Sequence, residues 1–141
     1  MPLWRTRSIG MQLYKYDIVG FLHWGYNFYS NQWSMDPIDP FGEVSGEGWV
    51  PAGDTHSVYP AHDGTALESV RIISFYEGLQ DMRAMKLAEL SCGKDAVVSV
   101  AEEIFGEAIR FDRCAKNGHT VMKLREAINE LIKEGVSSNE N

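Results

Sequence analysis

Apolar positions in the N-terminal part of the chain predict a helix, a buried strand and a long loop. In residues 5–16, apolar side chains recur on one stripe at helical spacing, which predicts a short helix. Residues 19–24 form a short apolar and aromatic run bounded by Gly20 and Gly25, which is typical of a strand covered on both faces. Residues 25–53 mix aromatic side chains with prolines and glycines. They are predicted to be a long functional loop.

A second short strand and a long helix are predicted further along the chain. Residues 55–59 suit a strand, which the turn signal Asp63-Gly64 follows. Apolar residues from 68 to 90 keep mostly helical spacing, and a helix there tolerates Gly78 at a cost of about 1 kcal/mol. A helix, a strand and a second helix in this order indicate an α/β layer.

Two shorter helices are predicted to follow. One covers residues 95–105, with Asp95 as its N-cap. The other covers residues 120–134, and Gly135 is expected to end it as the residue after the C-cap. Residues 136–141 are expected to fray.

The charge balance narrows the classes of partner. The chain has 20 acidic and 13 basic residues, which gives a net charge of −7. Nucleic acids and anionic membranes are bound chiefly through Lys and Arg, so the charge disfavours both as partners. Neutral sugars remain compatible with it. No run approaches the roughly 18 apolar residues of a membrane helix, and the N-terminal residues lack the apolar block of a signal peptide.

The cysteines and histidines predict neither a metal site nor a cofactor. Cys92 and Cys114 lack CxxC spacing, and two unpaired thiols are favoured over a disulfide. The four histidines are scattered, without the spacing of four residues that places two ligands on one helix face.

Residues 21–28 carry the most informative chemistry, because there a predicted strand leads directly into aromatic side chains and an amide. A sugar ring packs its C–H face on a flat Trp or Tyr and pairs its hydroxyl groups with Asn, Asp or Arg. Trp24, Tyr26 and Asn27 supply these groups, and barrel active sites are built at this end of a strand. The alternative interpretation is that Trp24 and Tyr26 are simply core residues.

Carboxylates in the long loop are interpreted as turn formers, since Asp36 and Asp39 each precede a proline. Asp54 is the exception, because it follows Gly53 at the start of the second predicted strand. Acidic and basic residues of the long helix are expected to form ion pairs with one another. Arg71 lies near the start of that helix, where the helix dipole does not favour a cation, so a partner such as Asp54 is expected.

Four blocks of residues, taken in order, carry a resemblance to a known family. They are residues 10–16, residues 20–27, residues 53–60 and residues 71–81. Together they resemble the C-terminal part of glycoside hydrolase family 123 and of a related domain of unknown function. The resemblance implies an α/β fold that is a C-terminal fragment of a (β/α)8 barrel, mostly helical, with two short strands and a long aromatic loop. A complete barrel needs about 250 residues.

The resemblance also implies an activity and a site. Family members are thought to remove N-acetylgalactosamine from glycans by retaining, substrate-assisted hydrolysis, in which an adjacent Asp-Glu pair does the chemistry. No such dipeptide occurs in this chain, so the resemblance implies a substrate-binding part that lacks the catalytic pair, and it assigns no catalytic residue here. The implied sugar-binding residues are Trp24, Tyr26 and Asn27, with Asp54 and Tyr59 as weaker candidates.

The organisation expected from the resemblance is a single partial domain over residues 1–141. Residues 1–91 form its barrel portion and residues 92–141 its C-terminal helices. A lone barrel strand leaves both edges unpaired, so a homo-oligomer or a missing N-terminal barrel portion is expected to cover it. The expected ligand is a glycan that contains N-acetylhexosamine. The alternative function is a non-catalytic module that binds carbohydrate or protein.

Overall fold

The computed structural model describes residues 2–139, and the chain divides into two compact units. Unit 1 runs from Gly20 to Ser74. Unit 2 combines residues 2–19 with the chain from Phe75 onward. The chain therefore leaves unit 2 after Val19 and returns to it within a helix. No helix in the described part of the chain is long and apolar enough to cross a membrane.

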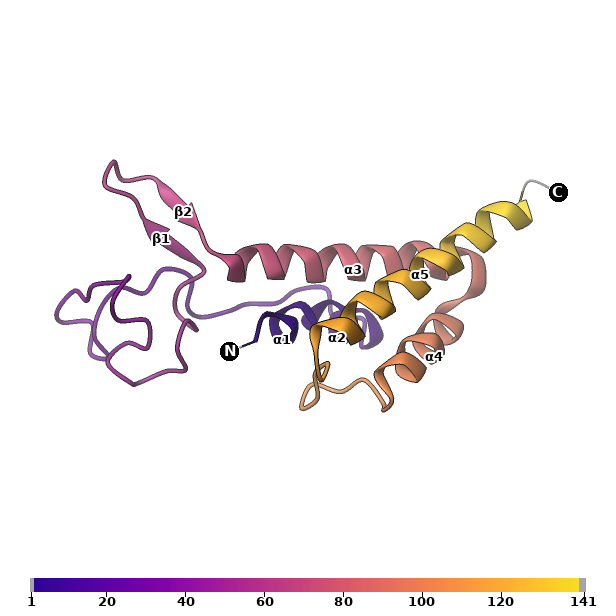
Figure 1. Cartoon of the computed structure of the whole chain (residues 1–141), viewed down its shortest axis with the longest axis horizontal. Helices are drawn as coiled ribbons and strands as arrows, with labels where there is room; N and C mark the ends of the chain where they lie inside the picture. The colour runs from indigo at the N-terminus through magenta and orange to yellow at the C-terminus, as the bar shows by residue number, and fades with distance from the viewer. Residues whose placement is uncertain (1, 140–141) are drawn as a thin grey trace. The chain divides into compact units, whose positions relative to one another are not determined.

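Unit 2 is built from helices. They are α1 (Leu3–Arg7), α2 (Ile9–Lys15), α4 (Lys94–Phe105), α5 (Gly118–Asn139) and most of α3 (Val70–Cys92), as Figure 1 shows. Apolar side chains spaced three or four residues apart form its core, including Val97, Ala101 and Phe105 of α4 and Val121, Leu124 and Ile128 of α5. The predicted helices at 5–16, 68–90, 95–105 and 120–134 are confirmed, with a break at Ser8 in the first.

Two glycines allow α2 and α3 to approach each other closely. A Cβ atom added at Gly10 would lie 1.8 Å from the carbonyl oxygen of Gly78, and one added at Gly78 would lie 2.6 Å from the carbonyl oxygen of Arg7. Both distances are shorter than any Cβ contact that a folded protein accepts. Gly78 is therefore required by close packing, which is a stronger role than the tolerated helix defect that the sequence pattern indicates.

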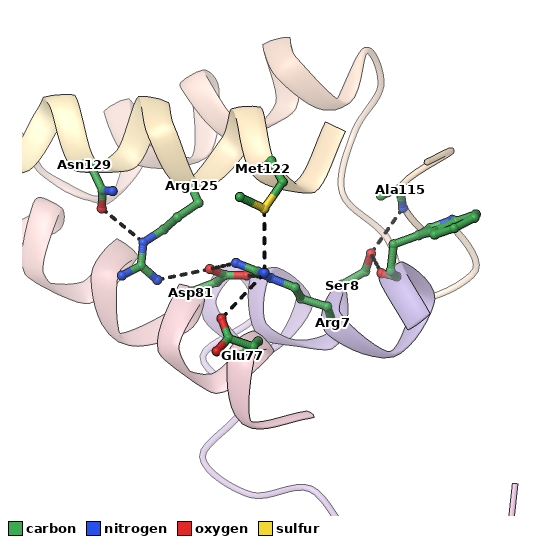
Figure 2. Close-up of polar contacts among 9 residues, drawn as sticks. Arg7, Ser8, Glu77, Asp81, Ala115, Met122, Arg125 and Asn129 are labelled. Carbon is green, nitrogen blue, oxygen red and sulfur yellow. Dashed lines mark hydrogen bonds and ion pairs between the residues drawn. The ribbon is translucent and has the colours of Figure 1, made fainter. Parts of the chain in front are cut away.

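A buried carboxylate joins three helices of unit 2 (Figure 2). Asp81 of α3 is only 4% exposed and accepts hydrogen bonds from Arg7 of α1, from Nε at 2.6 Å and from Nη2 at 2.9 Å. Arg125 of α5 donates to the same carboxylate from Nη1 at 3.1 Å. Glu77 lies 3.6 Å from Arg7. The expectation of ion pairs within α3 is wrong, because Glu77 and Asp81 pair with arginines of α1 and α5.

Unit 1 contains a β-hairpin and a long irregular loop. Strand β1 (Val58–Pro60) pairs antiparallel with β2 (Ala66–Glu68), and Val58 lies opposite Glu68. The predicted turn joins them: Gly64 has φ +83°, and Asp63 accepts a hydrogen bond from the backbone N–H of Thr65 at 3.0 Å. The first strand lies a little later than the predicted residues 55–59, and β2 is not indicated by the sequence pattern.

The predicted loop at 25–53 is confirmed, since its described structure consists of turns and bends with isolated bridges. The predicted buried strand at 19–24 is wrong. No strand forms there, and Val19 and Leu22 are 101% and 86% exposed. An apolar run becomes a strand only when a neighbouring strand binds its backbone groups. Within residues 2–139, neither Val19 nor Leu22 has such a partner.

Two predicted helix ends are also wrong. The N-cap of α4 is Gly93, two residues before the predicted Asp95, which lies inside the first turn. Helix α5 continues through Gly135 to Asn139, so most of the segment expected to fray is helical, and residues 140–141 lie outside the described residues. A Cβ at Gly135 would lie 2.1 Å from Ser91 Oγ, so this glycine marks close packing against α3. Cys92 and Cys114 are both free.

Candidate functional site

Three aromatic rings of unit 1 form a cluster at the loop. The ring of Trp24 lies 5.7 Å from that of Phe28 and 5.5 Å from that of Trp49, and the rings of Phe28 and Trp49 are 6.2 Å apart. Trp24 and Trp49 remain 49% and 51% exposed. The two indoles are therefore fixed by each other and still offer ring surface to a ligand.

A carboxylate lies beside this aromatic cluster. Asp54 accepts a hydrogen bond from the indole N–H of Trp24, with Nε1 3.1 Å from Oδ2. The other carboxylate oxygen lies 3.4 Å from Nε2 of His23, and Nδ1 of the same imidazole lies 2.6 Å from the carbonyl oxygen of Gly25. The structure thus brings together Trp24 and Asp54, two of the residues predicted for a sugar site.

The other three predicted residues lie elsewhere in unit 1. Tyr26 and Asn27 are exposed, and backbone bonds hold their segment to residues 55–58: Ser57 donates to the carbonyl of Tyr26 at 2.9 Å. No hydrogen bond or ring contact among the described residues joins their side chains to Trp24 or Asp54. Tyr59 of β1 belongs to a second group of rings, in which it stacks on Phe41 at 5.1 Å.

Carboxylates of the loop act as turn formers, as the sequence indicates. Asp39 accepts a hydrogen bond from the backbone N–H of Phe41 at 3.0 Å. Glu43 accepts bonds from the hydroxyl and backbone N–H of Ser45, and these bonds lower the pKa of Glu43. Among the described residues, no three His, Cys, Asp or Glu side chains are arranged to hold a metal ion.

A fully buried histidine lies at the centre of the second group of rings. His56 packs between Tyr29 and Tyr59, with ring centroids 5.4 and 5.5 Å away. Its Nδ1 contacts the hydroxyl of Thr55, and its Nε2 has no hydrogen-bond partner among the described residues. Burial lowers the pKa of His56, and the positive charge of Arg71 lowers it further. His56 is therefore held in its neutral form.

Acid is expected to destabilise unit 1 through His56. Because the folded state depresses the pKa of His56 below the ordinary value of 6.5, the unfolded chain binds the proton first as the pH falls. The stabilisation that neutral His56 contributes is thus fully present above about pH 6.5 and is lost progressively as the pH falls below that value. Urea unfolding followed by tryptophan fluorescence should show this loss in the wild type and a weaker pH dependence in His56→Gln. A pH dependence that is identical in both proteins would contradict the assignment to His56.

Arg71 does not contact Asp54, so the expected ion pair between them is wrong. The side chain of Arg71 instead donates from Nε to the carbonyl oxygen of His56 at 2.7 Å and from Nη2 to the hydroxyl of Tyr59. Its guanidinium lies against Gly53, where an added Cβ would be 2.9 Å from Nη1. Asp54 is already engaged by Trp24 and His23.

Comparison with protein families decides which family the fold and the aromatic site belong to. The model of the catalytic domain of glycoside hydrolase family 123 matches residues 1–88, more than half of the chain. The chain belongs to glycoside hydrolase family 123. No curated protein matches it.

The family 123 match includes the whole of unit 1 and therefore the aromatic cluster, Asp54 and the hairpin. In unit 2 it covers α1, α2 and most of α3, whereas α4 and α5 lie beyond it. The resemblance that the four sequence blocks indicate is confirmed, because the match covers all four of them.

Sequence reasoning missed three residues of the site. Phe28 and Trp49 complete the aromatic cluster with Trp24, and His23 contacts Asp54. Phe28 and His23 adjoin the predicted residues in the sequence. Trp49 comes 25 positions after Trp24. Only the path of the loop brings it back, and no local pattern encodes that path.

Proposed function

We propose that this chain binds the glycan substrate of a family 123 glycoside hydrolase at the aromatic cluster. The sugar is an N-acetylhexosamine, which Trp24, Trp49 and Asp54 bind at this cluster. Tyr26, Asn27 and Tyr59 are proposed to bind the glycan elsewhere in unit 1. The observation that carries the proposal is the contact between Trp24 and Asp54.

The chemistry of that contact suits a sugar. A half-exposed indole offers a flat apolar surface to the C–H face of a pyranose ring. The Asp54 carboxylate fixes the indole by accepting its N–H and keeps further acceptor sites for sugar hydroxyl groups. Trp49, set nearly edge-on to Trp24 at 76°, forms a second wall. Binding sites commonly combine such apolar walls with a few fixed polar groups.

The fold is proposed to be the C-terminal part of a (β/α)8 barrel, organised as one partial domain. In this proposal α3 is the last helix of the barrel. The exposed apolar side chains of Val19 and Leu22 support the proposal, because the elements of a complete barrel bury such side chains. A second copy of the chain, or a polypeptide that supplies the earlier barrel strands, would cover this exposed apolar segment.

The proposed reaction is retaining, substrate-assisted hydrolysis, to which this chain contributes substrate binding. The acid of that mechanism is not assigned here, because the sequence has no adjacent Asp and Glu. The same observation favours a second candidate function, a module that binds carbohydrate or protein without hydrolysing it.

Calorimetric titration of the chain with N-acetylgalactosamine tests the proposal, with glucose and galactose as comparison sugars. Trp24→Ala should weaken binding by roughly 5- to 30-fold, since loss of an aromatic platform removes about 1–2 kcal/mol. The matched control is Trp33→Ala, which removes an exposed loop indole that contacts no other ring among the described residues. Trp33→Ala should bind like the wild type.

Two outcomes would count against the proposal. Binding that Trp24→Ala and Trp33→Ala weaken equally would place the sugar elsewhere, and a folded wild type that binds no sugar would remove the binding role. A parallel assay with a chromogenic N-acetylgalactosaminide separates the two candidate functions. Turnover by the chain favours hydrolysis, whereas sugar binding without turnover favours the module that only binds.

A further inference from the structure

Among the partly exposed cations of the described residues, one lacks an acidic partner. Five of the basic side chains are only partly exposed, whereas the other Lys and Arg residues are exposed to solvent. Four of the five lie within 4 Å of a carboxylate; these are Arg7, Lys15, Lys94 and Arg125. The fifth, Arg71, forms no ion pair with any described residue. Removing a guanidinium from water without a counter-charge is costly, so this exception calls for a functional explanation.

The Arg71 guanidinium is nonetheless held firmly in place. Its Nε donates to the carbonyl oxygen of His56 at 2.7 Å, and its Nη2 donates to the hydroxyl of Tyr59. The guanidinium carbon lies 5.6 Å from the centre of the Tyr59 ring. All of these partners are neutral. They fix the orientation of the planar group and leave its charge uncompensated.

Two donors at this position remain available. Nη1 of Arg71 has no acceptor among the described residues, and the Tyr59 oxygen accepts from Nη2, which leaves its own O–H proton to donate. A planar fork of N–H groups with a neighbouring hydroxyl matches the oxygen atoms of a carboxylate or a sulfate. The chain as a whole carries a charge of −7 and repels anions, so attraction of an anion has to be local.

We propose that Arg71 and the hydroxyl of Tyr59 bind an anionic group of the glycan, either the carboxylate of a uronic acid or a sulfate ester. The inference rests on the proposed function, because it places this group on the sugar bound in unit 1. Gly53 lies against the guanidinium and directly precedes Asp54 in the chain. In this proposal the two residues have different roles on one glycan. Asp54 accepts hydrogen bonds from sugar hydroxyl groups, and Arg71 binds the anionic group.

The test compares neutral and anionic ligands on the whole chain by calorimetry and by NMR of the arginine Nε–Hε groups. The probes are N-acetylgalactosamine, its 6-sulfate, glucuronic acid and inorganic sulfate. The anionic sugars should bind at least about tenfold more tightly than the neutral one, because a charge-assisted bond is added. This advantage should shrink between about 20 mM and about 300 mM salt, while the affinity for the neutral sugar should not change. The preference between sulfated sugar and glucuronic acid identifies the anion.

Variants assign the effect to Arg71. Arg71→Gln should abolish the preference for anions and leave binding of the neutral sugar intact. Tyr59→Phe, which retains the ring and the guanidinium, should reduce the preference by roughly threefold and serves if Arg71→Gln unfolds. The control is Arg83→Gln, because Arg83 is an exposed arginine of the same helix without an ion pair among the described residues. It should behave as the wild type.

Failure of this inference is distinguishable from failure of the proposed function. Equal affinities for neutral and anionic sugars, or a preference that Arg71→Gln retains, would overturn the anion site and leave the sugar site standing. If no sugar binds but inorganic sulfate shifts the Nε–Hε signal of Arg71 saturably at constant ionic strength, the anion site stands without the sugar site. The absence of any response to sugars and to sulfate would overturn both.

Discussion

Gly10→Ala is expected to destabilise unit 2 by about 3 kcal/mol or more, although alanine is the better helix former. Alanine normally gains up to about 1 kcal/mol over glycine inside a helix. At Gly10 the added Cβ would lie 1.8 Å from the carbonyl oxygen of Gly78, and a backbone atom cannot move aside as a flexible side chain would. The helices would have to separate, and overpacking of this kind outweighs the gain in propensity.

Urea unfolding followed by circular dichroism measures the effect. The matched control is Gly20→Ala, because a Cβ at Gly20 meets nothing within 4 Å and the backbone there has no positive φ. That variant should unfold within about 0.5 kcal/mol of the wild type. A Gly10→Ala protein as stable as the Gly20→Ala control would mean that α2 and α3 do not cross at these glycines.

Asp81→Asn is expected to cost about 3 kcal/mol, because it leaves two partly buried arginines without their common carboxylate. Arg7 and Arg125 both donate to Asp81, and hydrogen bonding to this carboxylate raises the pKa of Arg7. Removal of one partner from a buried ion pair strongly destabilises a protein, since the charge that remains is poorly solvated. Asparagine keeps the shape of the side chain, so the loss of stability measures the effect of removing the negative charge.

The comparison variant is Asp112→Asn, which breaks an exposed pair between Arg110 and Asp112. Exposed pairs contribute at most about 1 kcal/mol, so this variant should stay close to wild-type stability in the same thermal or urea unfolding experiment. Adding Arg7→Gln to Asp81→Asn should recover part of the loss, because it removes one of the stranded charges. Additive losses in the double variant would indicate that Arg7 and Asp81 do not interact.

Helical segments were predictable from the sequence because their signal is local. The apolar spacing in residues 95–105 and 120–134 is repeated over several turns, and each segment can be interpreted without knowledge of its neighbours. Residues 19–24 show the opposite case. Their composition suits a buried strand, but a strand also needs a partner, and no partner is encoded in the segment itself.

Predictions for individual glycines failed for a related reason. Gly78 and Gly135 have the same local signatures as a helix defect and a helix end. Each in fact lies where another helix approaches within the space of a methyl group, close to Gly10 and Ser91 respectively. The candidate site was likewise predictable only where its signal is local. Trp24 was predicted because it follows an apolar run. Trp49 contacts Trp24 only because of the path of the loop, which the sequence pattern does not indicate.

The position of unit 1 within the sequence affects how the helices of unit 2 assemble. Residues 20–74, 55 positions in all, separate α1 and α2 from the part of the chain they pack against. Closing a flexible loop of that length costs about 3.5 kcal/mol of chain entropy. Helices α4 and α5 are joined by the shorter segment 106–117, for which the same relation gives about 2.2 kcal/mol. The stability of the docked α1 and α2 is therefore expected to depend on how compact unit 1 is, because a folded segment has less chain entropy to lose than a flexible loop of the same length.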